Sequence, residues 1–276
     1  MTDLYAVMGN PINHSKSPQI QSEFAEQTQQ KLVYSAMLVP IDGFSAAVKD
    51  FFKANGSGQG LNITVPFKEQ AFALADQLTA RAQTAQAVNT LMRLEDGQIL
   101  GDNTDGAGLV KDLTQNHNTP LSGRRVLVIG AGGAVRGILQ PCLEQNPSEL
   151  IVVNRTASKA QRLAEQFADL GNIKASRFED LAGEFDVIIN GTSASLSGDL
   201  PPVPASGIGA NTVVYDMMYG QEPTAFLVWA SENGAKAVID GLGMLVEQAA
   251  VSFALWRGVE PDSEQVLTQL RKQIQA

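Results

Sequence analysis

Residues 62–68, NITVPFK, end with a lysine in an unfavourable place. Asn-Ile-Thr-Val alternates polar and apolar residues as a strand does, and Pro66 suits the first turn of a helix, whose N–H groups are unpaired. Lys68 is therefore expected at a helix N-terminus, where the positive end of the helix dipole disfavours a cation. A lysine that gives up its proton more readily than usual is a candidate general acid or base.

Amides and a second charged group accompany this lysine. Asn62 and Thr64 lie two apart on the expected strand, so they face the same way beside Lys68. Asn89 in AVNT and Asp105 in DNTDG lie at strand ends or turns. Each has a purely structural alternative, Asn89 as a turn residue and Asp105 as the N-cap of the helix GAGLVKDL, and the sequence leaves both open.

Two serines in NPINHSKSP, Ser15 and Ser17, lie beside another strand end. Ser17 also suits the N-cap of a helix with Pro18 at its first position, and both roles are compatible. Such a set of hydroxyls, amides, one lysine and one aspartate suits a small polyhydroxylated substrate.

A glycine-rich turn follows the apolar run VLVI. Gly130 and Gly132 let the backbone turn tightly and approach a pyrophosphate, which the next helix N-terminus stabilises. Val135 stands where the third glycine of G-x-G-x-x-G would be, so the motif is incomplete. A strand precedes the turn and a second, residues 150–153, follows at the Rossmann distance, which favours dinucleotide binding.

The end of that second strand indicates which dinucleotide is preferred. An NAD-binding domain usually places Asp or Glu there, whereas this chain has Asn154-Arg155-Thr156 with Lys159 close behind. An arginine can pair with a 2′-phosphate and stack on adenine, although a solvated loop charge is the alternative for Arg155. The sequence therefore favours NADP.

Strands and helices alternate around these residues. The N-terminal strands are LYAVMG, LVYSAMLVP and GLNITVP, and helices are expected from Ser17, over GFSAAVKDFFKA and over residues 67–78. This alternation predicts a mostly parallel sheet with helices on its faces. AVNTLMRLEDGQILGDNTDG reads as two short strands joined at Asp96-Gly97, and a first unit closes near Asp105.

The rest of the chain repeats the alternation. Strands are expected in RVLVI, ELIVV, FDVIIN, TVVYD and KAVID, with helices after the glycine turn, over residues 158–170 and over TAFLVWASENG. This is a doubly wound pattern. Two helices, GMLVEQAAVSFALWRG and DSEQVLTQLRKQI, end the chain. The predicted fold class is α/β with two domains.

The composition of the chain limits which classes of partner we expect it to bind. The chain has 276 residues, 44% hydrophobic and 18% charged, with a net charge of −9, which disfavours nucleic acid. Neither a leader nor an apolar run of about eighteen residues is present, so we expect a cytoplasmic protein without membrane contact. Cys142 is expected to be a buried, inert thiol. The chain has only this cysteine and two histidines, His14 and His117, as typical zinc ligands, so we expect no metal site.

Eight motifs, in order along the chain, make it resemble the shikimate dehydrogenase family over essentially its whole length. They are GNPINHSKSP, NITVPFKE, AVNTL, GDNTDG, GAGGA, NRT, YDMMY and DGLGMLVEQA. The resemblance implies NADPH-dependent, reversible reduction of 3-dehydroshikimate to shikimate, a step of aromatic amino acid biosynthesis. It also implies a substrate-binding catalytic domain of residues 1–105 completed by helices 241–276, and a Rossmann-type NADP domain of residues 106–240.

Carried over by position, the resemblance implies site residues in three groups. The catalytic pair is Lys68 and Asp105, with Lys68 as general acid or base. Substrate contacts come from Ser15, Ser17, Asn62, Thr64, Asn89, Asp105, Tyr219 and Gln248. Cofactor contacts come from Gly130, Ala131, Gly132, Gly133, Ala134, Asn154, Arg155, Thr156, Lys159, Met217 and Gly241. Ala80 departs from members that carry an acidic residue near the cofactor.

Two alternatives remain at this point. A quinate/shikimate dehydrogenase with broader substrate use and NAD tolerance would be expected to carry an acidic residue in place of Asn-Arg-Thr. A catalytically silent NADP-sensing protein would have no reason to keep both Lys68 and Asp105 beside a polar pocket. The sequence leaves the oligomeric state open between monomer and homodimer.

Overall fold

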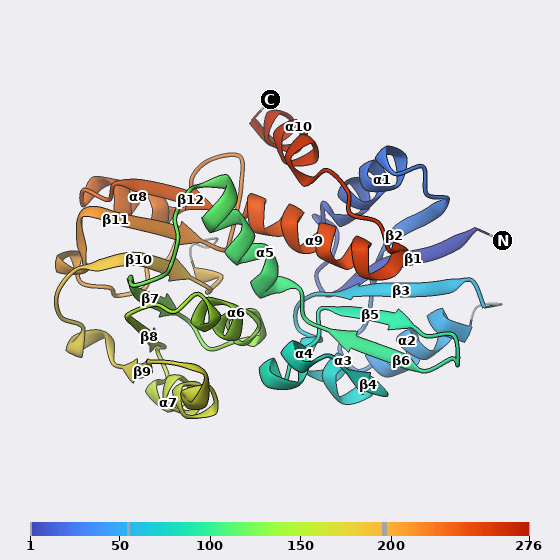
Figure 1. The fold of residues 1–276 in the computed structure, drawn as a ribbon, viewed down its shortest axis with the longest axis horizontal. Helices are drawn as coiled ribbons and strands as arrows, with labels where there is room; N and C mark the ends of the chain where they lie inside the picture. The colour runs from blue at the N-terminus through green and yellow to red at the C-terminus, as the bar shows by residue number, and fades with distance from the viewer. Residues whose placement is uncertain (1, 54–55, 195–197, 276) are drawn as a thin grey trace. The chain divides into compact units, whose positions relative to one another are not determined.

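The computed structural model describes residues 2–53, 56–194 and 198–275, and the chain forms two compact units. The first unit comprises Met1–Gly108 and Val246–Gln269, and the second comprises Leu109–Leu245 and Leu270–Ala276. Each unit is built around a six-stranded sheet (Figure 1). The predicted functional division, residues 1–105 with 241–276 and residues 106–240, stays a prediction.

The sheet of the first unit has the order β2-β1-β3-β5-β6-β4. Its strands are β1 (Asp3–Gly9), β2 (Leu32–Leu38), β3 (Gly58–Ile63), β4 (Gln77–Leu78), β5 (Thr90–Arg93) and β6 (Ile99–Asp102). β1 pairs in parallel with β2 and β3, but β5 runs antiparallel to β3 and to β6. Five of its six strands run in one direction, which confirms the predicted mostly parallel sheet; β5 is reversed because the predicted turn at Gly97, φ +86°, closes β5 and β6 into a hairpin.

The helices of the first unit are α1 (Ser17–Gln27), α2 (Phe44–Lys53), α3 (Lys68–Leu74) and α4 (Ala80–Ala85), with the greater part of α9 (Leu242–Arg257). The helix expected over residues 67–78 is present, but its predicted end is wrong, because α3 ends at Leu74. The chain then pairs with β6 as β4, and Thr79 N donates to Gly101 O at 3.0 Å. Pro66 also differs from its expected place, since it precedes the first helical residue and lies in a turn closed by Phe67 N to Thr64 O at 3.0 Å.

The second unit has an all-parallel sheet of order β12-β11-β10-β7-β8-β9. Its strands are β7 (Arg125–Ile129), β8 (Glu149–Val153), β9 (Ile173–Ser176), β10 (Phe185–Asn190), β11 (Ile208–Asp216) and β12 (Ala237–Asp240). Its helices are α6 (Gly133–Glu144), α7 (Ala157–Gln166) and α8 (Ala225–Glu232); α5 (Asp105–Lys111) and α10 (Ser263–Gln275) contain unit boundaries. This strand order is that of the doubly wound Rossmann fold, and it confirms the predicted fold class.

The apolar strands of the second unit are buried on both faces. Val126 and Val128 of β7 face one hydrophobic core, while Leu127 and Ile129 face the other. This explains why these strands read as continuous apolar runs rather than alternating ones. Cys142 belongs to the first of these cores, and burial raises its pKa to about 12, which confirms the predicted inert thiol.

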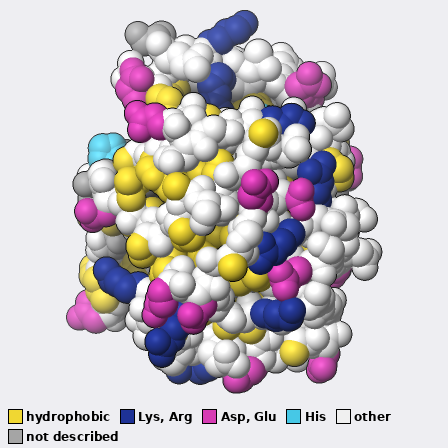
Figure 2. Space-filling view, turned by 90° about the vertical axis from the view of Figure 1, so that its left-hand side faces the viewer, with side chains coloured by type: hydrophobic (Ala, Val, Ile, Leu, Met, Phe, Trp, Pro, Cys, Tyr) yellow, Lys and Arg dark blue, Asp and Glu magenta, His cyan; other side chains and the backbone are white. Residues whose placement is uncertain are grey.

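The surface charge pattern and the properties of the helices bear on which partners the protein could contact. Figure 2 shows one face of the molecule, on which acidic and basic side chains are interspersed with apolar ones. A phosphate backbone would therefore meet acidic groups beside basic ones on this face. Within residues 2–53, 56–194 and 198–275, no helix is both long enough and apolar enough to cross a lipid bilayer.

Candidate active site

Lys68 and Asp105 form an ion pair in the first unit. Lys68 is the first residue of α3, as predicted, and its Nζ contacts Asp105 Oδ2. The two side chains are only 14% and 7% exposed. Asp105 Oδ1 accepts a hydrogen bond from Asn89 Nδ2 at 2.8 Å. Both carboxylate oxygens thus bind side chains, and Asp105 is the first residue of α5 rather than its N-cap, so the N-cap alternative is wrong.

Asn89 is buried and holds Asp105 from a second direction. Its Oδ1 accepts from the backbone N–H of Thr104 at 2.9 Å, and its Nδ2 also reaches Gln248 Oε1 at 3.2 Å. Because a backbone N–H can only donate, this contact fixes the amide so that Nδ2 faces the carboxylate. Asn89 therefore does more than form a turn, and it brings the predicted Gln248 of α9 to the same cluster.

Asn62 lies in the same buried region, at the end of β3. Its Nδ2 donates to Thr90 Oγ1 and to Ser252 Oγ, each at 3.1 Å. Its Oδ1 accepts from the Tyr34 hydroxyl at 2.7 Å. Thr64 follows the last residue of β3 and is half-buried, with its N–H donating to Met8 O at 3.0 Å.

Ser15 and Ser17 lie together at the start of α1. Ser17 is the first helical residue, and the N-cap position is Lys16, which makes no side-chain capping bond. The N-cap interpretation of Ser17 is therefore wrong. Burial raises the pKa of Tyr34 well above its ordinary value, and a hydrogen bond with the Ser17 side chain acts in the opposite direction. Ser15 Oγ accepts from Ser17 N at 3.3 Å.

Sequence reasoning missed four buried hydroxyl residues that join these amides. They are Tyr34, Thr90, Thr104 and Ser252. Thr90 Oγ1 and Thr104 Oγ1 lie 2.9 and 3.2 Å from Ser252 Oγ. Ser252 looked like an ordinary position of an apolar helix, whereas Thr90 and Thr104 lie inside the motifs AVNTL and GDNTDG. The hydroxyls meet only because β5, the start of α5 and α9 pack together.

A buried ion pair that sequence reasoning also missed anchors the segment before Asp105. Asp102 Oδ1 accepts from Thr79 Oγ1 at 2.6 Å and from Arg81 Nε at 2.7 Å. Burial alone would raise the pKa of Asp102, but the hydrogen bonds and charge of Arg81, with bonds from Thr79 and the Asn103 N–H, hold it below its ordinary value. The charged carboxylate thus ties β6 to the start of α4.

The glycine turn of the second unit has the geometry of a pyrophosphate site. Gly130 has φ +118°, and a Cβ there would meet Val135 Cγ2 at 3.1 Å, so the backbone requires glycine. Gly132 is the N-cap of α6, with no side-chain capping bond, and a Cβ there would meet nothing within 4 Å. Open space beside uncapped helical N–H groups fits a bound pyrophosphate.

The Asn154-Arg155-Thr156 segment lies next to this turn. Gly130 N donates to Val153 O at 2.8 Å, which joins the turn to the end of β8. Arg155 and Lys159 are exposed, and neither forms an ion pair within the described part of the chain. Two unneutralised cations beside the glycine turn fit an additional phosphate.

Met217 and Gly241 meet at the carboxyl ends of β11 and β12. A Cβ on Gly241 would lie 2.2 Å from Met217 O, so close packing requires glycine here. Tyr219 follows in the same segment and is half-buried; burial and then the charge of Asp240 raise its pKa. Tyr219 belongs to the second unit and the other predicted substrate residues to the first, so its role at the substrate stays a prediction.

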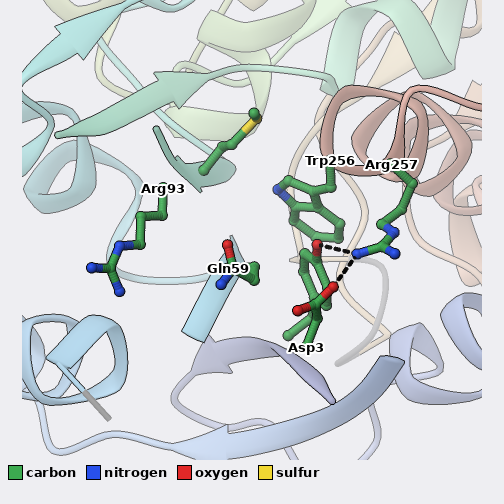
Figure 3. Close-up of a pocket in the computed structure, with 7 residues that line it drawn as sticks. Asp3, Gln59, Arg93, Trp256 and Arg257 are labelled. Carbon is green, nitrogen blue, oxygen red and sulfur yellow. Dashed lines mark hydrogen bonds and ion pairs between the residues drawn. The ribbon is translucent and has the colours of Figure 1, made fainter. Parts of the chain in front are cut away.

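A separate cavity of about 220 Å³ lies at the amino ends of β1 and β3, whereas Asn62 and Lys68 lie at or beyond the carboxyl end of β3. It is lined by Asp3, Tyr5, Gln59, Met92, Arg93, Trp256 and Arg257 (Figure 3). Arg257 donates to Asp3 Oδ2 at 2.5 Å and to Tyr5 Oη at 3.2 Å, while Arg93 extends away from this pair. The bonds of Arg257 fasten the end of α9 to β1.

Three protein-family models together match most of the chain. Residues 7–91 match "Shikimate dehydrogenase substrate binding domain", residues 112–197 match "Shikimate / quinate 5-dehydrogenase", and residues 241–271 match "Shikimate 5'-dehydrogenase C-terminal domain". A curated relative from Alkalilimnicola ehrlichii, named Shikimate dehydrogenase (NADP(+)), is 57% identical over 271 residues, which cover 98% of this chain and 99% of the relative.

Solved structures agree with this likeness. The Ael1 enzyme from Pseudomonas putida has a TM-score of 0.91 and 48% identity, covering 98% of each chain. The shikimate 5-dehydrogenase from Thermus thermophilus, solved in complex with NADP(H) and shikimate, has a TM-score of 0.87 and 33% identity, covering 98% of this chain and 99% of that one. On these similarities, the chain belongs to the shikimate dehydrogenase family.

Proposed function

We propose that this protein is an NADP-dependent shikimate dehydrogenase, which interconverts 3-dehydroshikimate and shikimate in aromatic amino acid biosynthesis. The observation that carries the proposal is the Lys68–Asp105 ion pair, held by Asn89 within a buried cluster of amides and hydroxyls. The relative from Alkalilimnicola ehrlichii is named for this activity and extends over nearly the whole chain, which supports the assignment.

Lys68 acts as general acid in the direction of reduction. NADPH, when bound, supplies the hydride that reduces the ketone carbon. Lys68 gives a proton from Nζ to the ketone oxygen as negative charge develops there, and in the direction of oxidation it takes the hydroxyl proton back. Asp105 holds the ammonium group in place, and Asn89 holds Asp105 in turn.

The remaining predicted contacts divide between the two units. In this proposal the first unit binds the substrate through Ser15, Ser17, Asn62, Thr64, Asn89, Asp105 and Gln248, and Tyr219 adds a contact from the second unit. The second unit holds the pyrophosphate at Gly130–Ala134 and the 2′-phosphate at Asn154, Arg155, Thr156 and Lys159, with Met217 and Gly241 at the nicotinamide. Open space at Gly132 and the unneutralised Arg155 support the cofactor assignment.

The absorbance of reduced nicotinamide tests the proposal directly. Purified protein is given shikimate or quinate with NADP⁺ or NAD⁺, in all four pairs. We expect fast reduction of NADP⁺ with shikimate and slow reduction in the other three pairs. Comparable rates with NAD⁺ or quinate would favour a quinate/shikimate dehydrogenase of broader specificity. Inactivity with every pair would favour an NADP-sensing protein.

Arg155→Ala is expected to raise KM for NADP⁺ by about 10- to 100-fold and to change KM for NAD⁺ by less than about twofold. The reason is that only NADP⁺ carries the 2′-phosphate with which a guanidinium pairs. Arg162→Ala removes another exposed arginine from α7 and serves as the control, since it should leave both values unchanged. An equal loss for NADP⁺ and NAD⁺ in Arg155→Ala would place 2′-phosphate recognition elsewhere.

A further inference from the structure

Tyr34 of β2 is a buried tyrosine that is hydrogen-bonded to a proposed substrate residue, Asn62. Its side chain is 7% exposed, and its hydroxyl donates to Asn62 Oδ1 at 2.7 Å. The Ser17 side chain acts on the same phenol by lowering its pKa, against the larger effect of burial. The hydroxyl therefore connects β2 to β3.

The direction of the Asn62 amide follows from hydrogen bonds that begin at Asn89. The backbone N–H of Thr104 donates to Asn89 Oδ1, so this oxygen is an acceptor without ambiguity. The Thr90 hydroxyl lies 2.8 Å from the same oxygen, so it must be the donor of that hydrogen bond. Thr90 can then offer only lone pairs to its other neighbours, Asn62 and Ser252.

Ser252 has the same polarity on the opposite side of the network. Its one proton goes to the carbonyl oxygen of Gln248 at 3.0 Å or to Thr90 Oγ1 at 2.9 Å, and either choice leaves lone pairs for Asn62. Asn62 Nδ2 lies within hydrogen-bond distance of Thr90 Oγ1, Ser252 Oγ and the carbonyl oxygen of Asn89, which gives its two protons three acceptors within the protein. Asn62 Oδ1 must then face Tyr34, and Tyr34 must be the donor. The raised pKa of Tyr34 keeps that proton on the phenol.

Loss of the Tyr34 hydroxyl would leave Asn62 Oδ1 without a protein donor among the described residues. A buried carbonyl oxygen without a donor is unfavourable, so the amide would rotate or shift. Rotation would break its bonds to Thr90 and Ser252, because both hydroxyls present lone pairs. Either response changes the group that Asn62 presents to a ligand, while Lys68 and Asp105 keep their own contacts.

We propose that Tyr34 is a positioning residue for substrate binding, which acts by fixing the side-chain amide of Asn62. The inference rests on the proposed function, because it assigns the hydroxylated substrate of that reaction to Asn62. It predicts a loss of substrate affinity without a loss of chemistry.

Tyr34→Phe removes the donor and keeps the ring. We expect KM for shikimate to rise about 10-fold, with kcat and KM for NADP⁺ within about twofold of the unchanged protein. Tyr5→Phe is a matched control. Tyr5 lies beside Tyr34 in register and packs on the same Trp256 ring, but its hydroxyl bonds with Arg257. It should leave KM for shikimate unchanged, and thermal unfolding shows that both variants are folded.

Combining the change with Asn62→Ala separates positioning from a general structural effect. If Tyr34 acts through Asn62, Tyr34→Phe should change KM by less than about twofold once Asn62 is alanine. A 10-fold effect that persists there would overturn the inference, as would an unchanged KM in Tyr34→Phe alone.

Calorimetric titration with shikimate, without NADP⁺, gives a second readout that does not depend on turnover. Weaker binding by Tyr34→Phe than by Tyr5→Phe supports the inference, and equal binding overturns it. If the unchanged protein binds shikimate but turns over no pair of substrates, the proposed function fails while the inference about Tyr34 is still decided by the titration.

Discussion

Lys68→Ala is expected to lower kcat for shikimate oxidation about 10³-fold and to change KM for NADP⁺ by less than about twofold. A positioned general acid or base contributes about 10²- to 10⁴-fold, and alanine can neither hold nor transfer the proton. Lys68 belongs to the first unit and the glycine turn to the second, so cofactor binding should persist. Steady-state absorbance gives kcat, and quenching of protein fluorescence by NADPH gives cofactor affinity.

A surface lysine provides the control. Lys49 is exposed on α2 in the same unit, and Lys49→Ala removes the same charge and side chain away from the ion pair. This variant should match the unchanged protein in kcat and in both KM values. A kcat within about threefold of normal in Lys68→Ala would remove Lys68 from the proton transfer.

Asp105→Asn is expected to lower kcat about 10²-fold, with a smaller change in KM for shikimate. The carboxylate accepts from Lys68 with one oxygen and from Asn89 with the other. An amide of the same shape has only one acceptor oxygen. Its NH₂ group must therefore face either the ammonium of Lys68 or the Nδ2 of Asn89. One contact is lost in either orientation, and the negative charge that holds Lys68 is lost in both.

Exposed Asp50→Asn on α2 tests whether removing any carboxylate from this unit has the same effect, and it should leave the rate unchanged. The two active-site substitutions should also be non-additive, because their residues act as one unit. Lys68→Ala with Asp105→Asn should be little slower than Lys68→Ala alone. A further 10²-fold loss in the double variant would mean that Asp105 acts independently of Lys68, and an unimpaired Asp105→Asn would remove it from the mechanism.

Local patterns were sufficient where a structure depends on residues that are neighbours in the chain. The hairpin at Gly97 and the turn at Gly130 were predicted correctly because a positive φ selects glycine at the position itself. The parallel strands of the second unit were readable as apolar runs because both faces of that sheet are covered. Lys68 was expected at a helix start because a proline follows the strand, and it is the first residue of α3 although Pro66 itself lies before the helix.

Prediction failed where long-range pairing overrode local preference. Residues 75–78 are compatible with a continued helix, but the hydrogen bonds of β6 draw this segment into the sheet as β4. β9 was missed because it is only four residues long and half of them are polar.

By itself, the sequence determined the α/β class, the order of most elements, the glycine turn and the position of a lysine at a helix start. Each of these follows from residue type and periodicity over a few neighbours. Local patterns left Asp105 open between a helix cap and a site residue, the resemblance implied its pairing with Lys68, and the tertiary structure shows that contact. Only the tertiary structure decided that Asn62 reaches Ser252, 190 residues away. The direction of a buried hydrogen bond depends on every donor and acceptor that packing brings together, and no local pattern contains that information.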